Sequence, residues 1–360
     1  MAMALLATIV TAQHQNPVNQ LIWLNGRVMC ANPISTVDSM TFANEVQMDT
    51  LHMLLPRTLI NVVHDTVIKT DTIVKTNIVY VKDTIYTNNC DNEGIGVFSV
   101  SADKKVSFSK GNLQYQASTN TWRFAENQYD TIGIDNENIS STYEGWIDLF
   151  GWSADNATAP FGISLSRNSE DYLGDFVDWG TNTIGTDAPN TWRTLSQDEW
   201  YYLFCTRTNA QQLFALGSVN GINGVIILPD NWVLPTGVIF TPSVEKGLVN
   251  QGNDYFDNSY NRHWLDNSYT LSDWHKMEKS GAVFLPAAGF RDNHEKDSSA
   301  LVEHASIGHV QNNGNYWASA AYENNALFAY YIDFTSVSLQ PRVYNACRYG
   351  FSVRLVRNIE

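Results

Sequence analysis

Thr194-Leu195-Ser196-Gln197-Asp198-Glu199-Trp200-Tyr201-Tyr202-Leu203-Phe204 carries the clearest helical signal in the chain. Ser196 is a residue type that caps helix N-termini, and Glu199 stands three positions later, as a reciprocal capping box requires. We therefore predict a helix that begins after Ser196. Around it lie short strand-like stretches separated by Asn, Gly and Ser runs, at 97–100, 105–108, 225–228, 238–241, 282–285, 329–334 and 351–356. Many short strands and few helices predict a mixed α+β domain.

The composition excludes several classes of partner. The chain has 360 residues, with 22 Lys and Arg against 37 Asp and Glu, and a formal net charge of −15. Nucleic acid and anionic lipid both select clustered basic residues, so neither is an expected partner. No apolar run approaches the roughly 20 residues that a membrane helix needs, and we expect no membrane insertion. With 12% aromatic residues, the chain is also not expected to be disordered throughout.

The N-terminal 93 residues differ in character from the rest. Residues 1–12 are apolar and end in Val10-Thr11-Ala12, which fits the small-residue cleavage pattern of a secretory signal, although the segment is short and has no basic start. We expect a truncated signal peptide there, and a frayed apolar terminus is the alternative. Next, Leu21 to Met29 predicts a hairpin around Asn25-Gly26.

A repeat of six residues runs through 64–87, with Asp or Asn recurring at positions 65, 71, 77 and 83. Because six is even, each repeat presents the same faces in an extended chain, and its Thr, Val, Ile and Tyr favour strands. We predict a β-rich stalk or linker over 13–93, with a flexible linker as the alternative. A lone strand of this length needs a partner, so we expect homo-oligomers to form through the stalk.

The acidity belongs to the C-terminal domain, which we place at 94–360. Five of the basic and six of the acidic residues lie in 1–90, so the remainder carries a formal net charge of −14. The four cysteines are scattered and form no C-x-x-C pair, so neither a zinc ribbon nor a disulfide framework is predicted.

Residues 192–200 resemble the helix of the formylglycine-generating-enzyme family, a variant of the C-type lectin fold. Further blocks are similar to a major paralogous domain of secreted Bacteroidetes and Fibrobacter proteins, and the resemblance extends over about 94–357. Those blocks are Gly111-Asn112-Leu113-Gln114-Tyr115, Gly145 to Trp152, Phe284 to Asp292, Gly314-Asn315-Tyr316-Trp317 and Gly350 to Arg357. The resemblance implies a C-type lectin-like (formylglycine-generating-enzyme-like) domain preceded by the β-rich stalk.

A closer similarity is to the variable proteins of diversity-generating retroelements. In that family, adenine mutagenesis rewrites the last few dozen residues, which here correspond to 318–349, and cannot produce Lys, Glu, Gln, Met or Trp. This window contains no Lys, Met or Trp, and one each of Glu and Gln. Its Tyr, Asn and Arg are the residues that binding surfaces favour. The expected contact residues are Ala318, Ala320, Tyr322, Asn324, Asn325, Phe328, Tyr330, Asp333, Thr335, Val337, Leu339, Arg342, Tyr344, Asn345, Cys347 and Tyr349.

Some of these aromatic residues could instead be inward-facing, because side chains alternate between the two faces of a strand. In the stretch 329–334 the alternation puts Ala329 and Tyr331 on one face and Tyr330 and Ile332 on the other. We assign Phe334, Phe351, Val353 and Leu355 to the core and roughly half of the window to the surface.

Catalysis is not expected. The enzyme branch of the family uses two nearby cysteines to bind copper, whereas the late region here has only Cys347. Glu303, His304 and His309 are weighed as metal ligands, but a solvated loop is favoured, and no metal site is predicted. We expect no cofactor and keep Ca²⁺ as an alternative at Asp130, Asp135, Asn136 and Glu137.

The sequence thus predicts a secreted or cell-surface, non-enzymatic adhesion protein. Its 318–349 face would bind a protein or glycan ligand on another cell or surface. One alternative is an undiversified structural or adhesive surface protein of the same fold. Another is a phage tail receptor-binding protein located in the virion tail, and a hydrolase or oxidase is the third.

Overall fold

The computed structural model describes residues 19–24, 27–33, 68–69, 72–73 and 96–359, the last range without 138, 141, 252–254, 259–261 and 293–304. The chain divides into two units, Met1–Asn89 and Cys90–Glu360. The expected signal segment at 1–12 and most of the 64–87 repeat lie outside the described residues, as do Glu303 and His304.

The first unit contains two antiparallel strand pairs. β1 (Asn19–Leu24) pairs with β2 (Arg27–Pro33), with Leu24 opposite Arg27. This pairing confirms the hairpin predicted around Asn25-Gly26. Within the repeat, β3 (Ile68–Lys69) pairs antiparallel with β4 (Thr72–Ile73).

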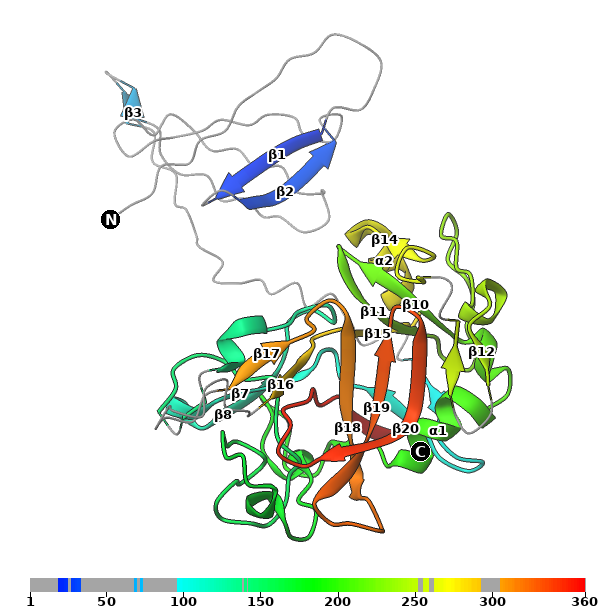
Figure 1. Ribbon diagram of the computed structural model, residues 1–360. Helices are drawn as coiled ribbons and strands as arrows, with labels where there is room; N and C mark the ends of the chain where they lie inside the picture. Colours follow the sequence, from blue (N-terminus) through cyan, green and yellow to red (C-terminus); the bar gives the residue numbers. More distant parts are fainter. Residues whose placement is uncertain are drawn as a thin grey trace. The chain divides into compact units, whose positions relative to one another are not determined.

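The second unit is a mixed helix-and-sheet fold, mostly strands with few helices, as the α+β prediction expects (Figure 1). Its longer helices are α1 (Gln197–Tyr201), which continues as the π-helical turn η7 (Tyr202–Thr206), and α2 (Leu271–Lys279). The 3₁₀ turns are η3 (Ala117–Thr119), η4 (Gly133–Glu137), η5 (Ser169–Tyr172), η6 (Trp179–Thr181), η8 (Ala210–Gln212) and η9 (Ser243–Lys246).

Most strands of this unit belong to four sheets, and the window 318–349 lies in the first of these, the central sheet. The central sheet has the order β12 (Val249–Asn250), β13 (Phe256–Asp257), β20 (Ser338–Ala346), β19 (Phe328–Thr335), β18 (Asn313–Ala321). A second has β14 (Ser268–Tyr269), β10 (Phe214–Val219), β11 (Ile222–Ile227) and β15 (Val283–Pro286). A third has β5 (Phe98–Ser99), β6 (Lys105–Phe108), β21 (Leu355–Ile359) and β9 (Arg193–Thr194). The fourth pairs β16 (Phe290–Asp292) with β17 (Ser306–Gly308).

A separate hairpin of β7 (Leu113–Gln116) and β8 (Thr121–Phe124) lies toward the β16–β17 side of the unit in Figure 1.

The predicted capping box is confirmed at the start of α1. The Ser196 hydroxyl accepts the Glu199 backbone N–H at 3.2 Å, and the Glu199 carboxylate accepts the Ser196 N–H at 2.9 Å. Glu199 also forms an ion pair with Arg193, with 2.7 Å between Nη1 and Oε2. The helix is thus joined at its N-terminus to the strand β9 that precedes it.

The central sheet is irregular where proline enters it. The register of β19 on β20 shifts between Tyr331 and Asp333, opposite the stretch of β20 that contains Pro341. Proline has no N–H to give to a ladder, so it is found where a strand bulges. This bulge determines which side chains on the two strands share a face.

Hydrophobic side chains cover both faces of the central sheet. Tyr330, Ile332 and Phe334 of β19 belong to one core cluster, together with Trp200 of α1. Ala329 belongs to another, against which Tyr331 packs from the same strand. The expectation that Phe334, Phe351, Val353 and Leu355 are core residues is confirmed, since each is at most 1% exposed.

Two predicted strands are corrected. The stretch 238–241 is not a strand. Thr241 bonds through its N–H and carbonyl to the side chain of Asn267, at 2.9 and 2.8 Å, so an amide replaces the neighbouring strand. In 351–356, the ladder begins only at Leu355, while Phe351 and Ser352 form single bridges to Phe150 and Tyr316. No helix in the described part of the chain is long and apolar enough to cross a membrane.

Candidate functional site

The window predicted from the sequence, 318–349, comprises the end of β18 from Ala318 onward, all of β19 and β20, and the two turns between them. These three strands lie side by side in the central sheet (Figure 1). The window is therefore part of a sheet, and its residues divide between two faces and two ends of that sheet.

One face carries a cluster of aromatic side chains near the β18–β19 turn. Tyr322 and Tyr344 stack with ring centroids 3.9 Å apart and planes at 9°. Tyr330 meets Tyr322 edge-on at 5.6 Å, and Phe328 meets Tyr344 edge-on at 6.0 Å. The β-ladder explains this gathering, because Tyr330 lies directly opposite Tyr344 and Phe328 is two residues away on the same face. We call Tyr322, Phe328, Tyr330, Arg342 and Tyr344 the tyrosine face.

Exposure on the tyrosine face rises toward its rim. Tyr330 is 8% exposed and Tyr322 is half-buried against the core, whereas Tyr344 is 49% exposed. Tyr344 is thus a large, stiff ring that is held from beneath by a second ring and open to solvent above. Such rings add contact area at a low cost in conformational entropy.

Polar groups surround these rings. The Tyr330 hydroxyl donates to Glu323 Oε2 at 2.5 Å, which lowers the pKa of Glu323, while burial and Glu323 raise the pKa of Tyr330 to about 12. Asn324 Nδ2 donates to the Tyr322 hydroxyl at 3.0 Å. Asn325 Oδ1 accepts the Leu327 N–H at 3.0 Å and so stabilises its own turn. Residues 323–326 are all exposed.

Two further residues of the site come from α1, outside the window. Asp198 forms an ion pair with Arg342, and the Arg342 guanidinium lies over the Tyr201 ring, 4.6 Å from its centroid. The window alone could not point to them. Asp198 and Tyr201 are three residues apart on the predicted helix and therefore share a helical face. The sequence therefore indicates that the two residues share a helical face, but it does not show that this face covers β20.

The structure corrects the predicted contact set at three positions. Ala318, Leu339 and Cys347 are fully buried. Ala318 and Leu339 pack into the core cluster beneath α1, and Cys347 into the cluster on the other side of the sheet. They were expected at the surface because they lie in the window. The folded sheet has core on both of its faces, so position in the window does not imply exposure.

Other predicted contact residues lie away from the tyrosine face. Thr335 and Val337 belong to the β19–β20 turn, at the opposite end of β19 from Phe328; there the Thr335 and Ser338 hydroxyls are 2.8 Å apart. Asp333 also lies toward that end, and burial raises its pKa to about 6. Tyr349 meets Phe290 edge-on at 5.9 Å in the second core cluster.

Intermediate exposure is also found at Ala320, Arg342 and Asn345. Asn345 alternates with Tyr344 on β20 and bonds to the Tyr331 side chain, on the face opposite the tyrosine face. Arg342 belongs to the tyrosine face already described. Ala320 packs at the edge of the same core cluster as Tyr322.

The two cysteines of this unit that the structure describes, Cys205 and Cys347, pack with different core clusters. Burial raises the pKa of Cys347 to about 12, so the group is a neutral thiol at physiological pH. Soft-metal binding and nucleophilic chemistry both use the thiolate.

Three of the four side chains considered for Ca²⁺ have separate partners. Asp130 Oδ2 accepts the Asn127 N–H at 2.8 Å, and Glu137 Oε1 accepts the Ile307 N–H at 3.1 Å. The buried Asn136 bonds to Asp148, whereas Asp135 is exposed. Over the residues that the structure describes, no three His, Cys, Asp or Glu side chains gather closely enough to share a metal ion.

Comparisons with family models, with curated proteins and with solved structures find no match to this chain. The case for a function therefore comes from the residues and their geometry.

Proposed function

We propose that this protein is a non-enzymatic ligand-binding protein of C-type lectin-like fold that contacts a macromolecular partner through the tyrosine face. The observation that carries the proposal is the Tyr322–Tyr344 stack, in which a 49% exposed ring is held parallel to a second ring at 3.9 Å. Binding hot spots are enriched in Tyr and Arg, and both are present here on neighbouring strands.

The surroundings of the stack support a contact surface for a large partner. The aromatic centre is bordered by Glu323, Asn324 and the Arg342–Asp198 ion pair, which gives an apolar middle and a polar rim. This is the usual anatomy of a protein interface. A surface of this composition suits a protein or an extended glycan on another surface.

The frame beneath the face supports a role in display. Trp152 donates its indole N–H to the Ala318 carbonyl at 3.0 Å, and its backbone N–H to the Cys347 carbonyl at 2.8 Å. Both ends of the window are thus bonded to one residue outside it. Side chains at the rim can change without removing these bonds, which is how loops on a stable scaffold carry function.

We further propose that the exposed part of the window is diversified, and that the protein acts outside the cell with no cofactor. The neutral, buried thiol of Cys347 supports the non-enzymatic assignment. Sequencing the 3′ end of the gene across many isolates tests diversification. We expect substitutions at exposed positions such as Asn324 and Tyr344 and none at Leu339. A window no more variable than 94–317 would leave an undiversified surface protein of the same fold.

Binding itself is tested with the full chain and its Tyr344→Ala variant. Both are fluorescently labelled and applied to a glycan array and to a panel of intact bacterial cells. Leu265→Ala is the control, because Leu265 is another large, exposed side chain, at 84%. We expect Tyr344→Ala, but not Leu265→Ala, to reduce the signal by about tenfold or more. Hits that Tyr344→Ala leaves unchanged would contradict the placement of the contact surface.

A further inference from the structure

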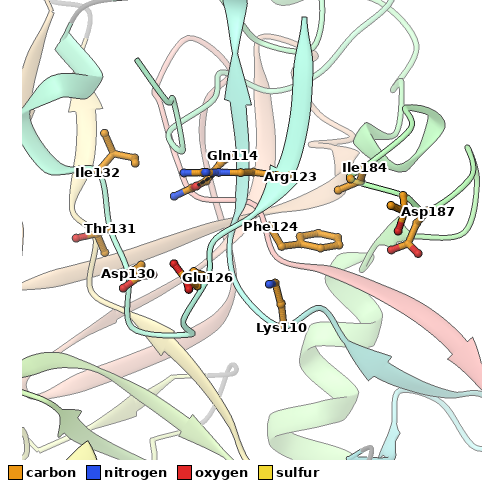
Figure 2. A pocket seen from close by; sticks show the side chains of 12 residues that line it. Lys110, Gln114, Arg123, Phe124, Glu126, Asp130, Thr131, Ile132, Ile184 and Asp187 are labelled. Atoms are coloured by element: carbon orange, nitrogen blue, oxygen red, sulfur yellow. Dashed lines mark hydrogen bonds between the residues drawn. The ribbon is translucent and has the colours of Figure 1, made fainter. Parts of the chain in front are cut away.

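An open cleft lies around the β7–β8 hairpin, and none of its lining residues belongs to 318–349 (Figure 2). Its volume is about 710 Å³. Its walls combine the apolar side chains of Phe124, Ile132 and Ile184 with charged and hydroxyl groups. A concave site with apolar walls and a few placed polar groups is the usual form of a small-molecule site.

Arg123 is held in one orientation in this cleft. It lies directly opposite Gln114 in the β7–β8 ladder, and its Nε donates to Gln114 Oε1 at 2.9 Å. Figure 2 shows the two side chains lying alongside each other. The guanidinium also sits over the Trp146 ring, 3.6 Å from the centroid. The backbone ladder, one hydrogen bond and one stacking contact therefore orient the guanidinium plane.

The charge of Arg123 interacts with the nearby carboxylates of Glu126 and Asp130, but neither of them forms an ion pair with it. Among the described residues, no carboxylate lies within ion-pair distance of Arg123 or of Lys110, which also lines the cleft. Two cations are thus available on a domain whose formal net charge is strongly negative. An oriented guanidinium can bind a carboxylate through two parallel hydrogen bonds.

Two of the three carboxylates that line the cleft are already engaged. Asp130 accepts the backbone and side-chain N–H groups of Asn127 at 2.8 and 3.1 Å, and Asp187 accepts the Trp192 indole N–H at 2.8 Å. Glu126 is exposed and forms no hydrogen bond among the described residues. The uncommitted groups are therefore two cations and one carboxylate, beside the hydroxyls of Thr131 and Thr186.

We propose that this cleft binds a saccharide that carries a carboxylate, such as a hexuronic acid. Arg123 and Lys110 hold the carboxylate of the sugar, while Glu126 and the threonine hydroxyls hydrogen-bond its hydroxyl groups. Phe124 and Ile184 face its apolar ring atoms. A doubly charged phosphate fits less well, because three carboxylates surround the cleft. Glycine could pair its ammonium group with Glu126, but it is too small to contact the apolar walls and the threonine hydroxyls of the cleft as well.

The test is isothermal titration calorimetry of the full chain with four probes: D-glucuronate, D-glucose, inorganic phosphate and glycine. We expect saturable binding of glucuronate, and binding of glucose that is weaker by about tenfold or more because glucose has no carboxylate. Phosphate and glycine should bind as weakly as glucose, because neither has a sugar ring to contact the apolar walls. Arg123→Ala and Lys110→Ala should each reduce glucuronate binding by a similar factor. Arg123→Lys should recover only part of it, because lysine has no planar fork.

Matched controls keep the outcome interpretable. Arg262→Ala and Lys246→Ala remove the same charges from exposed positions outside the cleft and should leave glucuronate binding unchanged. Melting temperatures of all variants show whether each one folds. Glucuronate that fails to bind the wild-type chain, or phosphate or glycine that binds as tightly, would overturn the proposal. So would binding that Arg262→Ala weakens as much as Arg123→Ala does. None of these results bears on the tyrosine face.

Discussion

Trp152 donates its indole N–H to the carbonyl of Ala318, 3.0 Å away, although the two residues are 166 positions apart in the chain. The same tryptophan bonds through its backbone N–H to the Cys347 carbonyl at 2.8 Å. Trp152 is 2% exposed, so both bonds are shielded from water. One residue of the scaffold thus bonds both to the second half of β18 and to the residue that follows β20. The tyrosine face lies on the strands between these two points.

Trp152→Phe should destabilise the second unit. The substitution keeps an aromatic ring but removes the N–H, which leaves the buried Ala318 carbonyl without this donor. We expect a loss of about 1–3 kcal/mol in the free energy of unfolding, measured by urea denaturation. Trp232→Phe is the control, since that half-buried tryptophan forms no such bond in the described chain, and should cost about 0.5 kcal/mol. Equal effects from the two variants would contradict the role assigned to Trp152.

Tyr344→Ala should separate stability from binding. The ring is 49% exposed and contributes mainly through its stack on Tyr322, so the loss should be on the order of 1 kcal/mol in unfolding free energy. Thermal denaturation should show a small fall in Tm, alongside the large loss of ligand signal proposed above. Tyr322→Ala should cost more stability, because its ring also packs against the core. A larger fall in Tm for Tyr344→Ala than for Tyr322→Ala would place Tyr344 in the core instead.

Leu339→Ala should behave as a core substitution despite lying in the window. Leu339 is fully buried and lies opposite Phe256 on one side and Phe334 on the other. We expect a loss of about 2–5 kcal/mol in unfolding free energy, measured by chemical denaturation. Val337→Ala, two residues away and only half-buried, is the control and should cost less than about 1.5 kcal/mol. Equal losses of unfolding free energy in the two variants would contradict the division of the window into core and surface residues.

Asp333 should make stability depend on pH. Burial raises its pKa in the folded state to about 6 from an ordinary value of 3.8. The folded state therefore binds the proton more tightly than the unfolded state does. The contribution of Asp333 to the free energy of unfolding is fully present below about pH 4, and it is lost as the pH rises through about 6. Relative to wild type, Asp333→Asn should gain stability between pH 4 and pH 6 and keep a constant advantage above. That advantage is on the order of 3 kcal/mol at most.

The measurement for Asp333 is urea denaturation of both proteins at intervals from pH 4 to pH 8. Comparing the two curves cancels the contribution of other carboxylates, including the buried Asp148. Curves that stay parallel across this range would show that Asp333 titrates normally.

Ser196→Ala should weaken α1. The variant loses the bond from the Glu199 N–H to the Ser196 hydroxyl, at a cost of about 1 kcal/mol in unfolding free energy. Ser196→Asp should restore most of this loss, because aspartate caps helix N-termini as well as serine does. The readout is the midpoint of thermal denaturation for the three proteins. A Ser196→Asp variant no more stable than Ser196→Ala would show that the cap does not stabilise the helix.

Local patterns in the sequence were sufficient for the elements that depend on neighbouring residues. The capping box at Ser196 and Glu199, the strand at 105–108 and the hairpin around Asn25-Gly26 all involve contacts within a few positions. The predicted strand at 238–241 failed for the opposite reason. The backbone N–H and carbonyl of Thr241 are satisfied by Asn267, a partner that no local pattern identifies.

The candidate site was predictable only as a segment. The tyrosines, asparagines and Arg342 of the window indicate a contact surface by residue type, and alternation along a strand limits which of them share a face. The sequence does not show that Pro341 shifts the ladder, that both faces of the sheet are covered, or that Asp198 reaches Arg342. The contact set predicted from the window therefore included Leu339 and Cys347, which are buried.

By itself, the sequence determined the α+β character of the second unit, the start of α1 and the segment in which the candidate contact residues lie, because these depend on local backbone preferences and residue type. Only the tertiary structure decided that Tyr344 is exposed, that Leu339 is buried and that Arg123 faces a cleft. Exposure depends on what packs against each face of a strand, and those partners include segments far away in the sequence, as Trp152 is for Ala318, 166 positions apart.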